Sequence, residues 1–505
     1  MNTSPPPLGT PSLDWRERWF GSEQRQRVRV GARRHWIFLV VLGVGALLRI
    51  VTQVAYRPAL LFIDSFGYLE NLHDLSPRQA QPIGYILLLL RPVLTVGTLA
   101  AVAAMQHLLG LAMGVAIYAV LVRLGCRRWI AVLAAAPVLL DAYQLQIEQN
   151  VMSEALFEAL VLAAVVLLLW RRPLTFPTLA IAGVLLGLAM TVRVVGGVLV
   201  LPAVAFALVA GTGGRDRLFR AATLALAFAV PVGIYAGYYW VETSRIGFNR
   251  GDALLLYGRA ATIVDCRGLD LPDYERVLCP KEPLGQRRGV NDYAHHSPYP
   301  GRVVLPPGKS RDTVLRDFAR RVFVHQPWDL ARHIATDFGK GFSWPRRTFA
   351  GDATIDRWQF QRDYPTFGHD DPAAAIRDQG GGGPSVAEPL AAFLRGYQLS
   401  VGYTPGPFLA LAFIAGLLAA FGVGKARRSG LRAACALATL CGICVLLAAD
   451  AFHFSWRYQL PALALAPLAG ALGVTALTGR LLPASRSSSP IPAPPDAHDS
   501  PSGAS

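Results

Sequence analysis

The sequence predicts an all-α polytopic membrane protein with about ten transmembrane helices and a mixed extracytoplasmic domain inserted between spans 7 and 8. Of its 505 residues, 53% are hydrophobic and only 16% are charged, and the mean hydropathy is +0.36. Soluble domains carry about 25% charged residues. The apolar residues are gathered in long blocks, and basic clusters lie between alternate blocks. Together these observations indicate a chain that crosses a bilayer many times.

Each predicted span is an apolar block of about the length that crosses a bilayer, which is ~20 residues for a hydrocarbon core of ~30 Å. The ten blocks are 36–55, 94–122, 128–142, 155–170, 177–192, 194–211, 219–240, 406–423, 431–449 and 458–477. The segment 83–93 is apolar but too short to span. We expect it to lie along the membrane surface.

Basic residues set the expected orientation. Clusters fall at 25–34, 123–128, 171–172, 215–220, 425–432 and 480–486, which are the loops on one side of ten alternating spans. Cytoplasmic loops carry such an excess of Arg and Lys. We therefore expect both termini in the cytoplasm, with a basic tail at 1–35 and a disordered Ser- and Pro-rich tail at 478–505.

The net charge of +16 is explained by these loops. No basic stripe with interleaved aromatic residues indicates a nucleic-acid partner. Arg and Ala are abundant while Lys is scarce, which favours a GC-rich bacterial genome. We therefore expect the bilayer to be a bacterial plasma membrane.

The chain divides by composition. An N-terminal transmembrane module at 36–241 carries the short outer loops, and further transmembrane helices follow at 406–477. Between them, the segment 242–405 is richer in charged residues, Pro, Gly and aromatics, and we expect it to form a domain outside the membrane. Within it, Asp312–His325 has apolar residues at helical spacing and predicts a helix.

Cys266 and Cys279 are the two cysteines of this predicted outer domain. An oxidising exterior favours a disulfide between them, which would close a short loop. The alternative is two unpaired thiols.

Asp64 is the most informative polar residue, because it follows the first span in an otherwise apolar stretch. Apolar neighbours would raise the pKa of its carboxyl, and a raised pKa suits a general base. The alternative is structural: Asp64 or Ser65 would begin a helix by accepting backbone N–H groups. The residues alone leave both interpretations open.

Three arginines at the predicted outer face, Arg193, Arg457 and Arg245, are candidates for binding phosphate, since guanidinium donors match its oxygens and stay charged. The alternative is interfacial anchoring, which is the better explanation for Arg245. Glu154 begins the fourth span, where the helix dipole favours an acid whatever its function. Glu148, a few residues earlier, lacks that explanation.

No HExxH, CxxC or P-loop pattern supports a dedicated metal site, and a divalent cation stays open as a cofactor. His453 is a candidate for substrate binding, although lone histidines are more often structural.

Five short motifs follow one another on the predicted outer side. They are Asp64-Ser-Phe-Gly-Tyr68, Gln81-Pro-Ile-Gly-Tyr85, Ser153-Glu-Ala-Leu-Phe157, Thr191-Val-Arg193 and Arg457-Tyr-Gln-Leu-Pro461. Their order resembles the GT-C superfamily of membrane glycosyltransferases, in particular its protein-mannosyltransferase-like members. The resemblance covers residues 36–240 and 450–477, and the segment 242–405 is outside it.

The resemblance implies an inverting transfer of a sugar from a polyprenyl-phosphate donor to a cell-envelope glycan, lipid or exported protein. It implies Asp64 as the general base, with Glu148 or Glu154 as a second carboxylate. Arg193, and with it Arg457, would neutralise the phosphate. Tyr68 and Tyr85, which end the first two motifs, would contact substrate.

Two other classes of protein remain as alternatives. A transporter or lipid flippase would need polar residues in mid-span and repeat symmetry. A non-catalytic membrane scaffold would use the segment 242–405 for binding and would tolerate replacement of Asp64 and Arg193.

Overall fold

The structure is a computed structural model that describes residues 22–77, 81–170, 173–245, 247–249, 252–368 and 370–479, with side chains from residue 33 onward. Most of both predicted tails, and the basic clusters at 171–172 and 480–486, lie outside the described residues. The described part is mostly helical with almost no sheet, as the sequence predicts. Its strands, β1 (Tyr56–Arg57) and β2 (Ser385–Val386), are two residues long and pair antiparallel.

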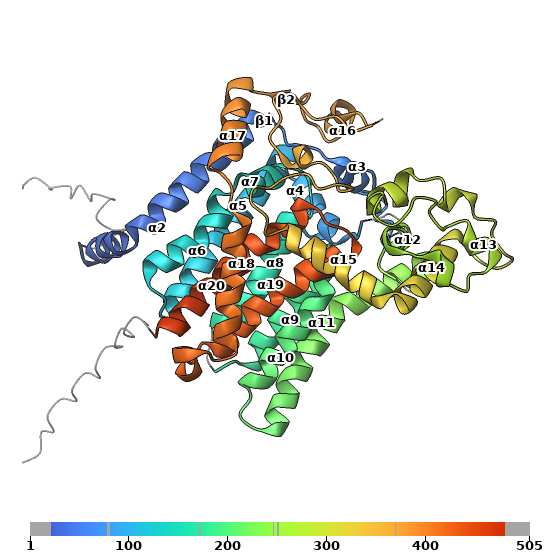
Figure 1. Cartoon of the computed structure of the whole chain (residues 1–505). Helices are drawn as coiled ribbons and strands as arrows, with labels where there is room; N and C mark the ends of the chain where they lie inside the picture. The colour runs from blue at the N-terminus through green and yellow to red at the C-terminus, as the bar shows by residue number, and fades with distance from the viewer. Residues whose placement is uncertain are drawn as a thin grey trace, which may run out of the picture.

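The N-terminal half is a bundle of apolar helices (Figure 1). Its elements are α2 (Ser22–Ala55), α3 (Ile63–Glu70), the π-helix η1 (Ile86–Leu90), α4 (Arg91–Leu94), α5 (Leu99–Arg123), α6 (Arg128–Leu140), α7 (Ala142–Gln149), α8 (Glu154–Trp170), α9 (Phe176–Val192), the 3-10 helix η2 (Val194–Leu199), α10 (Val200–Ala210) and α11 (Gly214–Thr243). The predicted surface segment 83–93 forms η1 and part of α4.

Five described helices are long and apolar enough to cross a membrane. They are Arg33–Ala55, Leu99–Arg123, Gly214–Thr243, Arg432–Phe452 and Trp456–Thr478. The pair α6 and α7, which bends by 44°, would make a sixth if counted as one span. Other apolar helices, such as α9 and α18 (Gly406–Ala420), are shorter. The count of about ten spans therefore remains a prediction.

The residues between the predicted spans 128–142 and 155–170 are mostly helix. All eight residues of α7 are buried, including the four polar residues Gln144, Gln146, Glu148 and Gln149. The break before α7 has a local cause: Pro137 lies inside α6, and the Asp141 carboxylate caps α7 by accepting the Tyr143 N–H. We expected a short polar loop between these spans, because hydropathy does not distinguish a polar buried helix from a loop.

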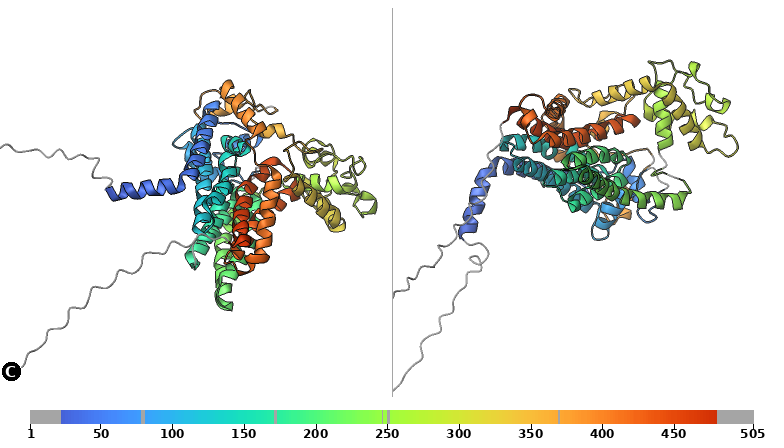
Figure 2. Two further views of the ribbon diagram at one scale, coloured as in Figure 1. Left: turned by 60° about the vertical axis from the view of Figure 1, so that its left-hand side comes forward. Right: turned by 90° about the horizontal axis from the view of Figure 1, so that it is seen from below.

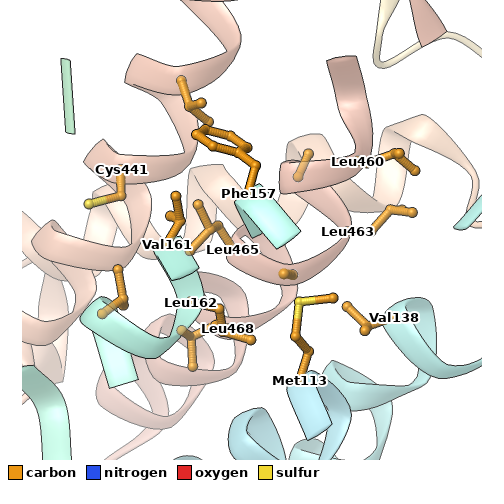
Figure 3. Packing of buried hydrophobic residues seen from close by; sticks show 14 of the residues in the cluster. Met113, Val138, Phe157, Val161, Leu162, Cys441, Leu460, Leu463, Leu465 and Leu468 are labelled. Carbon is orange, nitrogen blue, oxygen red and sulfur yellow. The ribbon is translucent and has the colours of Figure 1, made fainter. Parts of the chain in front are cut away.

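The C-terminal helices pack into the same core. They are α18, the 3-10 helix η7 (Gly424–Arg428), α19 (Arg432–Phe452), the 3-10 helix η8 (Trp456–Gln459) and α20 (Leu460–Thr478). Figure 3 shows side chains of α5, α6, α8, α19 and α20 meeting in one cluster. Small residues let α20 approach closely: a Cβ at Gly473 would lie 2.5 Å from the carbonyl carbon of Ala415.

The segment between α11 and α18 contains short helices joined by loops. They are α12 (Asp252–Ile263), η3 (Cys266–Gly268), α13 (Asp273–Arg276), the π-helix η4 (Asp292–His296), η5 (Pro300–Arg302), α14 (Arg311–His325), α15 (Pro327–Lys340), η6 (Ile355–Trp358), α16 (Pro372–Asp378) and α17 (Glu388–Ser400). The predicted helix Asp312–His325 is confirmed as α14. The predicted Cys266–Cys279 disulfide is also present.

This segment has two parts. The first, residues 252–325, has its own hydrophobic cluster between α12 and α14. The second, residues 342–400, packs on the end of the bundle that carries Asp64, which we call the Asp64 end (Figures 1 and 2). There β1 pairs with β2, and the Tyr56 ring stacks on Phe360 at 5.4 Å.

Candidate active site

Asp64 lies in the first turn of α3, and its side chain points away from the helix backbone. Ser65 takes the capping role, since its Oγ accepts the Phe62 N–H at 2.9 Å. The Asp64 carboxylate instead accepts from Gln81 Nε2 at 3.3 Å and forms an ion pair with Arg457. Asp64 therefore does not cap α3, which was the structural alternative for this residue.

Three further charged residues meet Asp64 from distant parts of the chain. Arg457 comes from η8, and its Nε lies 3.6 Å from Oε1 of Glu154 at the start of α8. The same Glu154 oxygen pairs with Arg193, which follows the last turn of α9. We call Asp64, Glu154, Arg193 and Arg457 the charge cluster.

Aromatic and hydroxyl side chains frame the charge cluster. The Tyr458 hydroxyl accepts from Arg457 Nη2 at 3.0 Å, and the Arg193 guanidinium lies over its ring at 4.9 Å. The Arg193 guanidinium also donates to Ser153 Oγ at 3.4 Å. Trp358, from the segment between α11 and α18, packs against the Arg457 guanidinium at 5.4 Å.

The charge cluster holds two guanidinium and two carboxylate groups, so its formal charges balance. Burial alone would raise the pKa of Asp64, but the nearby Arg457 and Arg193 charges outweigh burial and hold that pKa below its usual value. The expectation of a raised pKa was wrong because it considered only the apolar sequence neighbours. Asp64 is an anion in this structure at physiological pH.

The two predicted tyrosines lie beside the charge cluster. Tyr68 is buried, and burial raises the pKa of its hydroxyl, which therefore stays protonated. Its ring meets that of Tyr85 edge-on at 4.9 Å. The Tyr85 hydroxyl donates to Gln106 Oε1 at 2.9 Å and so points into the bundle.

His453 packs edge-on against Tyr458 at 5.2 Å. Burial, helped by the Arg457 and Arg259 charges, lowers the pKa of its imidazole to about 3. His453 is therefore neutral, and its Nδ1 is buried without a partner among the described residues.

Glu148 lies in a separate cluster inside the bundle. It is fully buried, and its carboxylate contacts Arg49 Nη2 at 2.8 Å and His107 Nδ1 at 2.9 Å. Gln144 Nε2 adds a donor at 3.2 Å. These contacts occupy the carboxylate and give Glu148 a structural explanation that the sequence did not reveal.

Arg245 is not brought to the charge cluster. It follows α11, and its partly exposed guanidinium pairs with Asp312 of α14 at 3.3 Å. Within the described ranges, no three His, Cys, Asp or Glu side chains are grouped as a metal ion would require.

Sequence reasoning missed Tyr458, Gln81 and Trp358. The first two stand inside quoted motifs, so attention to the neighbours of Arg457 and Tyr85 would have found them. Trp358 lies in a segment without regular periodicity, and no sequence signal placed it near Arg457.

No protein-family model and no curated protein matches the chain. Its structure is similar to solved structures of the oligosaccharyltransferase AglB from Archaeoglobus fulgidus. The apo form matches with a TM-score of 0.44 and 16% identity over 87% of this chain and 50% of that one. The complex with an inhibitory peptide and dolichol-phosphate gives 0.41 and 13% over 88% and 51%.

A third structure, tethered to an acceptor peptide, gives a TM-score of 0.41 and 11% identity over 88% of this chain and 50% of that one. The chain thus spans about half the length of these neighbours.

Proposed function

We propose that the chain is an inverting membrane glycosyltransferase. It takes a sugar from a polyprenyl-phosphate donor and transfers it to a cell-envelope glycan, lipid or exported protein at the outer face of a bacterial plasma membrane. The observation that carries this proposal is the charge cluster. It brings the Asp64 carboxylate together with two phosphate-compatible cations, Arg193 and Arg457, at one end of a bundle of apolar helices.

In the proposed reaction, an acceptor hydroxyl oxygen attacks the anomeric carbon of the donor sugar. Asp64 takes the hydroxyl proton as the new C–O bond forms. The bond from the anomeric carbon to the phosphate oxygen breaks, and its electron pair stays on that oxygen. Arg193 and Arg457 stabilise the charge that develops on the leaving lipid phosphate. One displacement inverts the anomeric configuration.

Donor binding requires the charge cluster to open. The cleft beside Arg193 and Arg457 has a volume of only about 20 Å³, room for about one water. Its other walls include the apolar Phe157, Val195 and Val445, which suit the lipid end of a donor. A phosphate would enter by taking the Arg457 guanidinium from Asp64. The carboxylate would then lose its counter-ion and become a stronger base.

Glu154 suits a different role from that of the base. Its Oε1 is held by the two arginines, while its Oε2 is buried without a hydrogen-bond donor among the described residues. A buried acceptor without a partner is costly, so a substrate hydroxyl is a fitting donor for it. We propose that Glu154 positions the arginines and orients a sugar hydroxyl.

The proposal is tested by measuring transfer of radiolabelled sugar from a panel of polyprenyl-phosphate donors in membranes that contain the protein. Asp64→Asn keeps the size of the side chain and removes the base. We expect transfer to fall by about 10²–10⁴-fold. The matched control is Asp273→Asn, an exposed aspartate of α13, which should leave transfer unchanged.

Equal transfer by wild type and Asp64→Asn would remove Asp64 as the base. Absence of transfer from every donor, with lipid movement across vesicles still catalysed, would replace the glycosyltransferase proposal by a flippase.

A further inference from the structure

A cavity lies at the Asp64 end, between the chain just before Asp64 and the loop that follows η6. Its volume is about 600 Å³, within the ~300–1,000 Å³ typical of sites for small molecules. Leu60, Leu61 and Phe62 line one side, and residues 354–367 line the other. We call it the loop cavity.

The loop cavity is lined by hydrogen-bond donors as well as by hydrogen-bond acceptors. Three arginines and two aspartates face it, and they are Arg357, Arg362, Arg395, Asp356 and Asp363. The side chains of Asp356, Arg357, Arg362 and Asp363 are exposed to solvent, and none of them forms an ion pair or hydrogen bond with another described residue. Phe62, Tyr364 and Phe367 add aromatic rings.

An orphaned amide gives independent evidence for a ligand. Gln146 of α7 lines the loop cavity and is only 5% exposed, yet its Oε1 has no hydrogen-bond partner among the described residues. Leaving a buried acceptor unsatisfied is unfavourable. A ligand hydroxyl that donates to Gln146 Oε1 would remove this cost.

The mixture of groups distinguishes between classes of ligand. A lipid chain would leave the five charged side chains facing hydrocarbon. An acidic peptide would meet the two aspartates, and a basic peptide would meet the three arginines. A sugar hydroxyl both donates and accepts, so it can satisfy carboxylate, guanidinium and amide groups at once. The apolar C–H faces of sugar rings pack on aromatic side chains.

We propose that the loop cavity binds a short oligosaccharide and that the acceptor of this enzyme is therefore a glycan. This inference rests on the proposed glycosyltransferase function and narrows its acceptor from three classes to one. The cavity adjoins the charge cluster through Phe62, which lines the cavity and whose ring lies 5.6 Å from the Arg457 guanidinium. A saccharide end near Phe62 would approach Asp64, two residues further along the chain.

The first measurement is equilibrium binding to the purified full-length protein, with a panel of neutral di- to tetrasaccharides of mannose, glucose, galactose and arabinose. Wild type should bind at least one class. Arg362→Ala and Gln146→Leu should each weaken binding by about tenfold, the effect of losing one good hydrogen bond. Gln146→Leu should keep or raise the melting temperature, since it removes an unsatisfied acceptor. The matched control is Arg377→Ala, an exposed arginine of α16 outside the cavity.

The second measurement is transfer to the saccharide that binds. The two cavity variants should raise the KM for the acceptor and leave the KM for the polyprenyl-phosphate donor unchanged.

Two outcomes separate the inference from the proposed function. Sugar transfer to a peptide or lipid by a wild-type protein that binds no saccharide would overturn the glycan acceptor and leave the glycosyltransferase standing. Saccharide binding that the cavity variants abolish, without transfer from any donor, would keep the loop cavity as a carbohydrate site and overturn the glycosyltransferase.

Discussion

Arg457 is shared between the two halves of the proposed chemistry. Its guanidinium pairs with the Asp64 carboxylate and also lies within 3.6 Å of Glu154. In the proposed reaction, Arg457 would link the base to the phosphate, because phosphate binding would withdraw the positive charge that keeps Asp64 a weak base. Asp64 would then gain basicity only when a donor is present, which limits wasteful hydrolysis.

The pH dependence of transfer tests this link. The positive charge of Arg457 lowers the pKa of Asp64, so removing that charge raises this pKa. Activity requires the anion and is lost as the pH falls through the Asp64 pKa. We therefore expect Arg457→Gln to move the acid limb of the kcat/KM profile to higher pH, besides lowering kcat.

The control for this measurement is Arg245→Gln, which removes a guanidinium paired with Asp312 rather than with Asp64. Its acid limb should coincide with that of wild type. An acid limb that Arg457→Gln leaves in place would show that Asp64 is not the group that titrates.

The sequence predicted the four residues of the charge cluster better than it predicted the side chains that contact them. Asp64, Glu154, Arg193 and Arg457 stand in short motifs, and the structure brings all four together. The contacts of Glu148 were not predicted, because its partner Arg49 lies 99 residues away and no local pattern reveals such a pair.

At the scale of elements, Arg49 explains how four helices meet. From α2 its guanidinium donates to the Val138 and Leu139 carbonyls at the end of α6, at 3.0 and 2.8 Å. The same side chain pairs with Glu148 of α7, which also contacts His107 of α5. The bend between α6 and α7 leaves carbonyls without helical partners, and Arg49 satisfies two of them.

This junction leaves no room at Gly110 of α5. A Cβ there would overlap Glu148 Oε1 and lie 2.5 Å from Arg49 Nη2. We expect Gly110→Ala to destabilise the protein by about 1–3 kcal/mol, as overpacking does, and to lower the melting temperature in detergent.

The matched control is Gly43→Ala in α2, where an added Cβ meets no atom within 4 Å. It should leave the melting temperature unchanged or raise it, because Ala favours the helix. Equal melting temperatures for Gly110→Ala and wild type would mean that the α5–α7 junction is looser than described.

Where a helix is apolar, as in α5, α11 and α19, its ends lie near the ends of the apolar block that predicted it. The apolar blocks did not predict α7, whose polar residues form hydrogen bonds with side chains from other helices. The loop at 354–367 also escaped prediction. Buried Ile355, Trp358 and Phe360 alternate irregularly there with charged residues, which fits neither helical nor strand periodicity.

For the whole molecule, the helix order places the charge cluster and one basic loop at opposite ends. α19 runs from Arg432 to Phe452, close to Arg457, so the basic residues Lys425–Arg428 before it lie at the far end. The positive-inside bias would place that far end in the cytoplasm and the Asp64 end outside. The Cys266–Cys279 disulfide fits the same orientation, since disulfides persist in oxidising compartments.

Labelling of introduced cysteines tests this orientation. Val304 and Arg428 are both exposed, the first between α11 and α18 and the second in η7. In intact cells, a membrane-impermeant maleimide should label Val304→Cys, and it should label Arg428→Cys only after permeabilisation. The parent protein is the control, because three of its four free cysteines are buried. The reverse pattern would place the charge cluster in the cytoplasm, where the proposed lipid-linked chemistry would have to be abandoned.

The pairing of Asp64 with Arg457 spans 393 residues, and that of Tyr56 with Val386 closes almost as long a loop. During translation, Asp64 reaches the membrane long before the ribosome has made Arg457. A chain released early would therefore carry the predicted base without the cation that holds it, and without half of the phosphate site. Nonsense mutations anywhere before codon 457 should consequently abolish the proposed transfer.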